Sequence, residues 1–136
     1  MDDIAINKAE VIRRCLARIT EEFRGDPSRL ANFTIQNSVI LNLLRACEAS
    51  IDLAMHRIAV GHLGIPQNSR DAFDILATSG LITPACARTM KHMVGFRNIA
   101  VHDYQRIQLE ILNAILTEHL ADFESYLAEL ALPSDL

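Results

Sequence analysis

The feature that most constrains the fold is a row of apolar residues spaced three and four apart through the first half of the chain. That spacing puts them on one face of an α-helix, whereas a half-buried strand would repeat every second residue. Asn32 to Thr34 suit an N-cap, and Gly61 or Gly64, with Pro66 beyond, suits the end. We therefore expect one long helix between them, with an apolar stripe of Ile35, Val39, Leu43, Cys47, Ile51, Ala54 and Ile58.

The rest of the chain has the same helical spacing, and strand alternation, internal repeats and domain linkers are absent from the sequence. Half of the residues are hydrophobic and only 5% are aromatic, which suits a core of leucine, isoleucine and alanine. These patterns predict a single all-α domain over residues 1–136, a helical bundle with a short extra helix. The other expected helices run from near Asn7 to Arg24, from an N-cap at Ser69 to Ser79, from Thr83-Pro84 onward, and from about Gln105 to Leu130.

The sequence also excludes several classes of protein. Cys15, Cys47 and Cys86 are odd in number and far apart, so we expect a reducing, cytoplasmic setting and no disulfide framework. The first residues lack the pattern of a signal peptide, and no run of about 18 apolar residues could cross a bilayer. Metal-ligand spacings such as CxxC and HExxH are missing, as is a Gly-rich phosphate loop. No membrane, metal or cofactor is therefore expected.

The charge distribution is more informative than the net charge of −4. Residues 84–106 carry four cations against one acid, a balance of +3, whereas residues 107–136 carry six acids and no cation. A local basic patch of this size can orient a phosphate backbone but does not predict tight binding to duplex DNA. A solvated helix face with a few cations explains the same charges equally well.

The basic segment contains the residues with the most distinctive chemistry, Arg97-Asn98-Ile99-Ala100-Val101-His102-Asp103-Tyr104. Arginine holds a phosphate with a planar fork of donors at any working pH. Histidine gives or takes a proton near neutrality. RNA carries its own nucleophile in the 2′-hydroxyl group, so these two residues suffice for RNA cleavage without a metal.

The spacing of Arg97 and His102 poses a geometric problem. Five residues apart on one continuous helix, their side chains would point about 140° apart. Gly95 before the pair, and Asp103 as an N-cap for the last helix, predict a break that lets Arg97 and His102 converge at a helix junction. The Tyr104 hydroxyl is then expected at the mouth of the same site, with Asn98 orienting a neighbour or contacting a phosphate.

Two carboxylates on the long helix are unusual beside so apolar a stripe. Glu48 and Asp52 lie four residues apart, below Arg45. The sequence leaves two interpretations open. The carboxylates pair with Arg45 or with an arginine of the motif and so support the site, or they belong to a solvated helix face.

The arrangement of Arg97, Asn98 and His102 resembles the R-polar-x(3–5)-H signature of HEPN domains, a superfamily of small helical bundles rich in ribonucleases. With Tyr104, it resembles the R-x4-H-x-Y form of the HepT toxin family. Residues 38–49, 63–71 and 93–98 are also similar to HepT sequences. The resemblance covers nearly the whole chain, is weakest after Leu120, and implies a homodimeric, HEPN-like antiparallel four-helix bundle.

The resemblance also implies a function, that of a metal-independent endoribonuclease toxin in a bacterial toxin–antitoxin system of the type VII kind. Arg97 and His102 would be catalytic and would face those of a second subunit across a cleft, with Glu48, Arg45 and Asn98 in support. The partner would be a nucleotidyltransferase antitoxin of the MntA type, which transfers AMP from ATP to Tyr104.

Two other functions remain open at this point. A non-catalytic helical module would use Arg97 and His102 as ligands for a nucleotide or a nucleotidyltransferase. A purely structural dimeric bundle would bury and satisfy the motif, with no cleft beside it. Only the ribonuclease needs Arg97, His102 and Tyr104 together.

Overall fold

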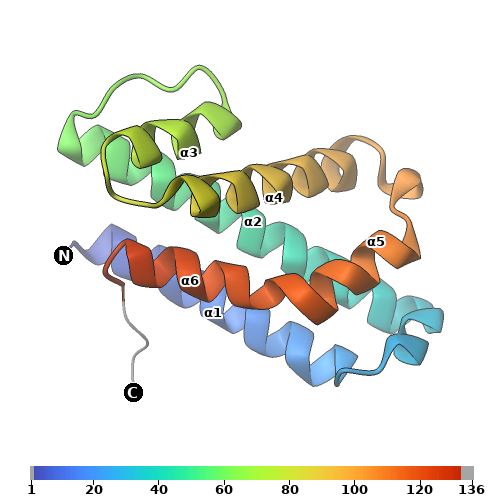
Figure 1. Cartoon of the computed structure of the whole chain (residues 1–136). Helices are drawn as coiled ribbons and strands as arrows, with labels where there is room; N and C mark the ends of the chain where they lie inside the picture. The colour runs from blue at the N-terminus through green and yellow to red at the C-terminus, as the bar shows by residue number, and fades with distance from the viewer. Residues whose placement is uncertain (1, 133–136) are drawn as a thin grey trace.

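The computed structural model describes residues 2–132, and over that range it is entirely helical (Figure 1). The helices α1 (Asp3–Phe23), α2 (Phe33–Gly61) and α4 (Pro84–His102) pack with a C-terminal arm made of α5 (Leu109–Ala114) and α6 (Leu120–Glu129). The short α3 (Ser69–Thr78) covers one end of α2 and α4. The prediction of an all-α bundle with a short extra helix is therefore confirmed.

Capping residues explain where the first two long helices begin and end. Asp2 accepts a hydrogen bond from the Ala5 backbone N–H at 2.8 Å, so α1 begins before the predicted start near Asn7. Its first turns bury small alanines, which a search for large apolar residues misses. The predicted end of α1 at Arg24 and the predicted cap of α2 at Asn32 are confirmed. The helix α2 ends at Gly61, as expected, followed by His62 in the left-handed region with φ 51°.

The caps of the next two helices include one small correction. Asn68, rather than Ser69, caps α3, because its side-chain oxygen accepts the Asp71 backbone N–H at 2.8 Å. Ser69 is thus the first residue of α3, and its hydroxyl is left for another partner. Thr83 caps α4 and Pro84 is its first residue, as predicted.

The prediction of one continuous C-terminal helix from Gln105 to Leu130 is wrong. A 3₁₀ turn η2 (Tyr104–Arg106) comes first, and residues 107 and 108 are extended before α5 begins. A π-helical segment η3 (Ile115–His119) then separates α5 from α6. The Thr117 hydroxyl donates to the Asn113 carbonyl oxygen there, a side-chain bond of the kind that bends helices. Apolar spacing alone does not reveal either interruption.

The core lies between α1, α2, α4 and α6, and the predicted stripe of α2 is buried apart from Ile35, which is partly exposed. Tyr126 is fully buried, and its hydroxyl donates to the Ser50 carbonyl oxygen at 2.9 Å. Its ring meets Phe73 edge to face at 5.6 Å between centroids, which ties α6 to α2 and α3. The three cysteines are buried free thiols. Within residues 2–132, no helix combines the length and apolarity needed to span a membrane.

Candidate functional site

The helix α4 carries both Arg97 and His102 and continues without a break between them. The predicted break near Gly95 is therefore wrong, and the chain turns only at Asp103, where φ is −154° and ψ is 67°. Gly95 stays helical because buried residues on both sides of it fix α4 against the core. Arg97 and His102 consequently do not converge within one chain. They lie about 140° apart around the axis and about 7.5 Å apart along it.

Arg97 points inward and is held by residues of three helices. Its Nη1 atom lies 3.3 and 3.4 Å from the two carboxylate oxygens of Glu48 on α2. Its Nη2 donates to the Ser69 hydroxyl oxygen on α3 at 2.9 Å, and its Nε donates to the Asn98 side-chain oxygen at 2.9 Å. Only 20% of the Arg97 side chain is exposed. The guanidinium is thus fixed in place while part of it remains open to a ligand.

The contacts decide between the interpretations of the α2 carboxylates. Glu48 pairs with the motif arginine, as one interpretation held, whereas Asp52 pairs with Lys8 at 3.1 Å. Arg45 is exposed and, within the described part of the chain, forms no ion pair. Asn98 does orient its neighbour Arg97. The supporting positions of Glu48 and Asn98 therefore have a structural basis, while that of Arg45 rests on the sequence prediction alone.

His102 and Tyr104 lie on either side of the turn at Asp103, and both are exposed. The His102 imidazole makes no hydrogen bond to any of the described residues. The Tyr104 hydroxyl donates to the Asn37 side-chain oxygen on α2 at 2.5 Å, and 44% of Tyr104 is exposed. Partial burial raises the pKa of the Tyr104 phenol above its usual value. The phenol therefore stays protonated at neutral pH and is reachable from outside.

Two of these contacts were missed by sequence reasoning. Ser69 looked like a helix cap, and Asn37 is one polar residue among several on α2. Their partners lie 28 and 67 residues away in the chain. No local pattern in the sequence signals such a pairing, because it depends on how α2, α3 and α4 pack.

Four apolar residues within ten positions of His102 in the chain are exposed. Ile99, Val101, Leu109 and Ile111 are each between 40% and 52% exposed. Of these four, Ile99 and Ile111 come together and line a cavity of about 420 Å³ between α4 and the α5–η3 arm, whose other lining is largely apolar. Exposed apolar residues gathered in one place usually mark a contact surface.

The chemistry available at this site is phosphate binding and proton transfer. A fixed guanidinium binds a phosphate, and an exposed imidazole exchanges protons near neutral pH. Nearby, burial raises the pKa of the Cys47 thiol to about 12, so this cysteine is not a thiolate nucleophile. Among residues 2–132, no group of three histidine, cysteine, aspartate or glutamate side chains is placed to hold a metal ion.

Comparison with known proteins gives consistent results. The family model described as "Ribonuclease HepT-like" matches residues 9–130. The chain is 51% identical over 128 residues to the mRNA nuclease HepT of Shewanella oneidensis, a match covering 93% of this chain and 96% of that protein. A solved toxin–antitoxin structure with AMP-PNP is similar with a TM-score of 0.90 and 48% identity, over 96% of this chain and 98% of that chain. The structure of the tri-AMPylated Shewanella oneidensis HEPN toxin in complex with MNT antitoxin is similar with a TM-score of 0.90 and 49% sequence identity, over 96% of this chain and 98% of that chain.

Proposed function

The chain belongs to the HepT-like ribonuclease family, as its motif indicated, and on that premise we propose that it is the toxin of a toxin–antitoxin pair and cleaves RNA. The observation that carries this proposal is the contrast on α4 between a fixed arginine and a free histidine. Arg97 is held by Glu48, Ser69 and Asn98, whereas the His102 side chain is exposed and has no hydrogen-bond partner within residues 2–132. A purely structural motif would bury and satisfy both.

In the proposed reaction, the RNA 2′-hydroxyl oxygen attacks the adjacent phosphorus atom. His102 takes the proton of that hydroxyl or gives one to the departing 5′-oxygen, a contribution of typically 10²–10⁴-fold. Arg97 binds the scissile phosphate and stabilises the negative charge that grows on its oxygens. The P–O5′ bond breaks, which leaves a 2′,3′-cyclic phosphate and a 5′-hydroxyl end. DNA is not a substrate, because it lacks the attacking group.

The active unit is proposed to be a homodimer. Because Arg97 and His102 face different sides of α4, one chain alone does not bring them onto one phosphate. The exposed Ile99 and Ile111, which line one largely apolar cavity between α4 and the α5–η3 arm, supply a surface for a second copy. A two-fold axis through that surface would place the motif of one subunit opposite the motif of the other.

Control of the toxin is proposed to act through Tyr104. The partner antitoxin, a nucleotidyltransferase, transfers AMP from ATP to the phenol. The Tyr104 oxygen attacks the α-phosphorus and loses its proton, and pyrophosphate leaves. The product carries a bulky group and a negative charge two residues from His102, where it would exclude an RNA phosphate. We propose a cytoplasmic location as well, since ATP, the partner and the RNA substrate would all be available there.

The proposal is tested by RNA cleavage in chelator, with protein whose Tyr104 is shown by intact mass to be unmodified. We expect the wild type to produce 2′,3′-cyclic phosphate ends and His102→Ala to lose about 10²–10⁴-fold in rate. His62→Asn is a matched control, since it removes an exposed imidazole at a left-handed position that asparagine tolerates.

Equal cleavage by wild type and His102→Ala would remove His102 from the chemistry. No cleavage by the unmodified wild type across several classes of RNA would instead favour a non-catalytic module that binds a nucleotide or a nucleotidyltransferase.

A further inference from the structure

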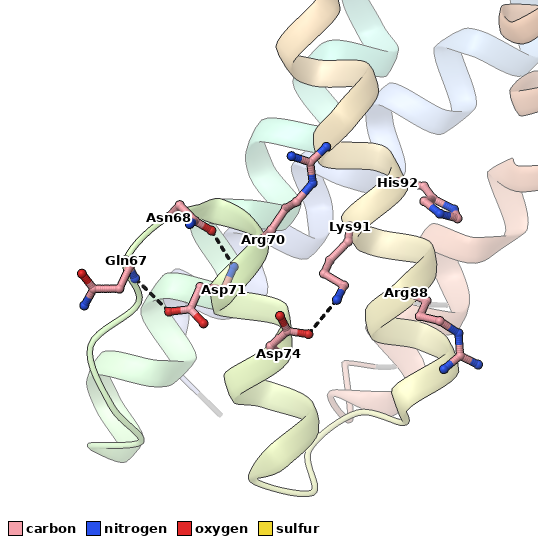
Figure 2. Close-up of a pocket in the computed structure, with 8 residues that line it drawn as sticks. All are labelled: Gln67, Asn68, Arg70, Asp71, Asp74, Arg88, Lys91 and His92. Carbon is pink, nitrogen blue, oxygen red and sulfur yellow. Dashed lines mark hydrogen bonds and ion pairs between the residues drawn. The ribbon is translucent and has the colours of Figure 1, made fainter.

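A larger cavity, of about 740 Å³, lies between α3 and α4 and contains none of the motif residues (Figure 2). We call it the α3–α4 pocket. Its charged lining comes from Arg70, Asp71 and Asp74 on α3 and from Arg88 and Lys91 on α4, with His92 beside them. Nothing in the proposed reaction uses this pocket.

The cations of the pocket lie on the same face of α4 as His102. At 100° per residue, Arg88, Lys91, Gly95 and His102 all fall within about 60° of the helix circumference. The side chains of Arg88, Lys91 and His102 are exposed or partly exposed. Arg97 lies on the other side of the helix, toward α2. A ligand bound along the outer face of α4 would therefore meet the pocket and His102 in one line.

Arg70 occupies the one position on this face of α4 where the helix itself has no side chain. Gly95 offers no side chain at this point of α4, and the Arg70 Nη2 atom lies 3.1 Å from where a Cβ atom of residue 95 would be. The Arg70 guanidinium thus rests against α4 at Gly95, beyond Lys91, although Arg70 belongs to α3 (Figure 2). The next residue along α3 toward its start, Ser69, binds Arg97. The pocket and the Arg97 site therefore share the first turn of α3.

The pocket has an excess of positive charge and free donors. Lys91 pairs with Asp74 at 2.9 Å, and the Asp71 carboxylate accepts the Gln67 backbone N–H at 2.9 Å. Arg70 and Arg88 are in no ion pair with any residue that the structure describes. Three cations against two carboxylates leave a charge of +1. Two planar guanidinium groups are available to donate to the two charged oxygens of a phosphodiester.

From this geometry we propose that the α3–α4 pocket binds a backbone phosphate of the RNA strand whose scissile bond lies at His102. Arg70 and Arg88 are the main ligands, and Lys91 joins them when the phosphate displaces Asp74. Eleven residues of α4 separate Lys91 from His102, about 16 Å along the axis, so the bound phosphate belongs to a nucleotide some way along the strand. This inference rests on the proposed function, because it concerns the substrate of the same reaction.

The test is binding of a short single-stranded RNA with 2′-O-methyl groups, which cannot be cleaved, measured by fluorescence anisotropy over a range of salt concentrations. Lys91→Ala and Arg88→Ala are each expected to raise the Kd by about three- to tenfold and to reduce the salt slope by about 0.7, the value for one lost single-strand phosphate contact. The kcat/KM for a dinucleotide, too short to reach the pocket, should stay unchanged.

The chain provides a matched control. The Lys8–Asp52 pair, at 3.1 Å with side chains 33% and 54% exposed, closely resembles Lys91–Asp74, whose side chains are 32% and 52% exposed. Lys8→Ala should leave RNA affinity unchanged. Asp74→Asn, which frees Lys91, should lower the Kd, whereas Asp52→Asn should not. A merely structural role for Lys91 predicts no gain in affinity from Asp74→Asn.

The outcomes separate this inference from the proposed function. If the variants bind the RNA as tightly as wild type, or Lys8→Ala weakens binding as much as Lys91→Ala, the pocket is not a phosphate site. If they lose affinity as expected but wild type cleaves no RNA, the pocket is a phosphate site for RNA, while the ribonuclease proposal and the alignment of the strand with His102 both fail. If wild type binds no RNA at all, both fail.

Discussion

Replacing Arg97 with lysine keeps the positive charge at the site and removes the fork of donors. The guanidinium reaches three partners on three helices at once: Glu48 at 3.3 Å, and Ser69 and Asn98 at 2.9 Å each. A lysine ammonium is a single point of charge, so it reaches one of these partners from the same backbone position. We expect it to stay with Glu48, the only one of the three that is charged.

The size of the effect follows from the contacts that are lost. Two hydrogen bonds, to Ser69 and Asn98, are removed in a partly exposed setting, where each is worth about 0.5–1 kcal/mol net. The free energy of unfolding should therefore fall by about 1–2 kcal/mol, too little to unfold the protein. The rate of RNA cleavage should fall much further, by about 10²–10³-fold, as when one preorganised donor to a transition-state oxygen is lost.

The two effects are measured separately, by denaturant unfolding and by single-turnover cleavage of unmodified protein. Arg106→Lys is the matched control. Arg106 also lies near the turn after α4, but its side chain is 77% exposed and its one ion pair, to Asp103, is 3.7 Å long. We expect the control to change neither quantity. Cleavage by Arg97→Lys within about threefold of wild type, less than 1 kcal/mol, would refute the importance of the fork.

Three further predictions concern other parts of the structure. Asn37→Ala should slow AMP transfer to Tyr104, measured with radiolabelled ATP, and leave RNA cleavage unchanged, because it removes the acceptor that orients the phenol among the residues the structure describes. Faster transfer would mean that Asn37 restrains the hydroxyl instead. Gly95→Ala should raise the free energy of unfolding by up to about 1 kcal/mol, because alanine has the higher helix propensity and the exposed end of Arg70 can move away from the new methyl group. A lower free energy of unfolding in urea would mean that Arg70 is fixed. Burial raises the pKa of Tyr126 well above its usual value, so its contribution to stability is complete below about pH 10 and is lost as pH rises further. Phenolate absorbance should therefore show Tyr104 titrating in the folded protein and Tyr126 only with unfolding, and two phenols titrating before unfolding would contradict the burial.

Local signals in the sequence were sufficient for most of the fold. Asn32 and Thr83-Pro84 act as caps where predicted, because a cap needs only the residue itself and the next turn. The stripe of α2 is buried because its spacing matches the helical repeat. Errors in the predicted helix caps were small. For example, Ser69 was predicted to cap α3, and the neighbouring Asn68 does so. The neighbouring residues are both N-cap types, and only the packed structure selects one.

The larger errors arose where packing overrides local preference. Gly95 is a poor helix former and favoured a break, yet α4 continues through it because its neighbours are core residues. Leucine spacing after Gln105 favoured one helix, yet the chain must first turn away from α4 at Asp103. Partners such as Ser69 for Arg97 and Asn37 for Tyr104 come from distant helices, so the sequence identified the motif but not what holds it.

Arg97 and His102 differ in what each still requires before reaction. Arg97 is oriented by the protein itself, so binding a phosphate costs it little further ordering. The His102 imidazole is exposed, has no hydrogen-bond partner among the described residues, and lies one turn from Ile99, whose exposed side chain is on the rim of the apolar cavity. Its orientation must come from whatever covers that rim. In the proposed dimer the second copy does so, which makes the general acid–base group, rather than the phosphate-binding group, the part of the site that depends on assembly. Modification of Tyr104, two residues from His102, would then act beside the group that the single chain leaves unfixed.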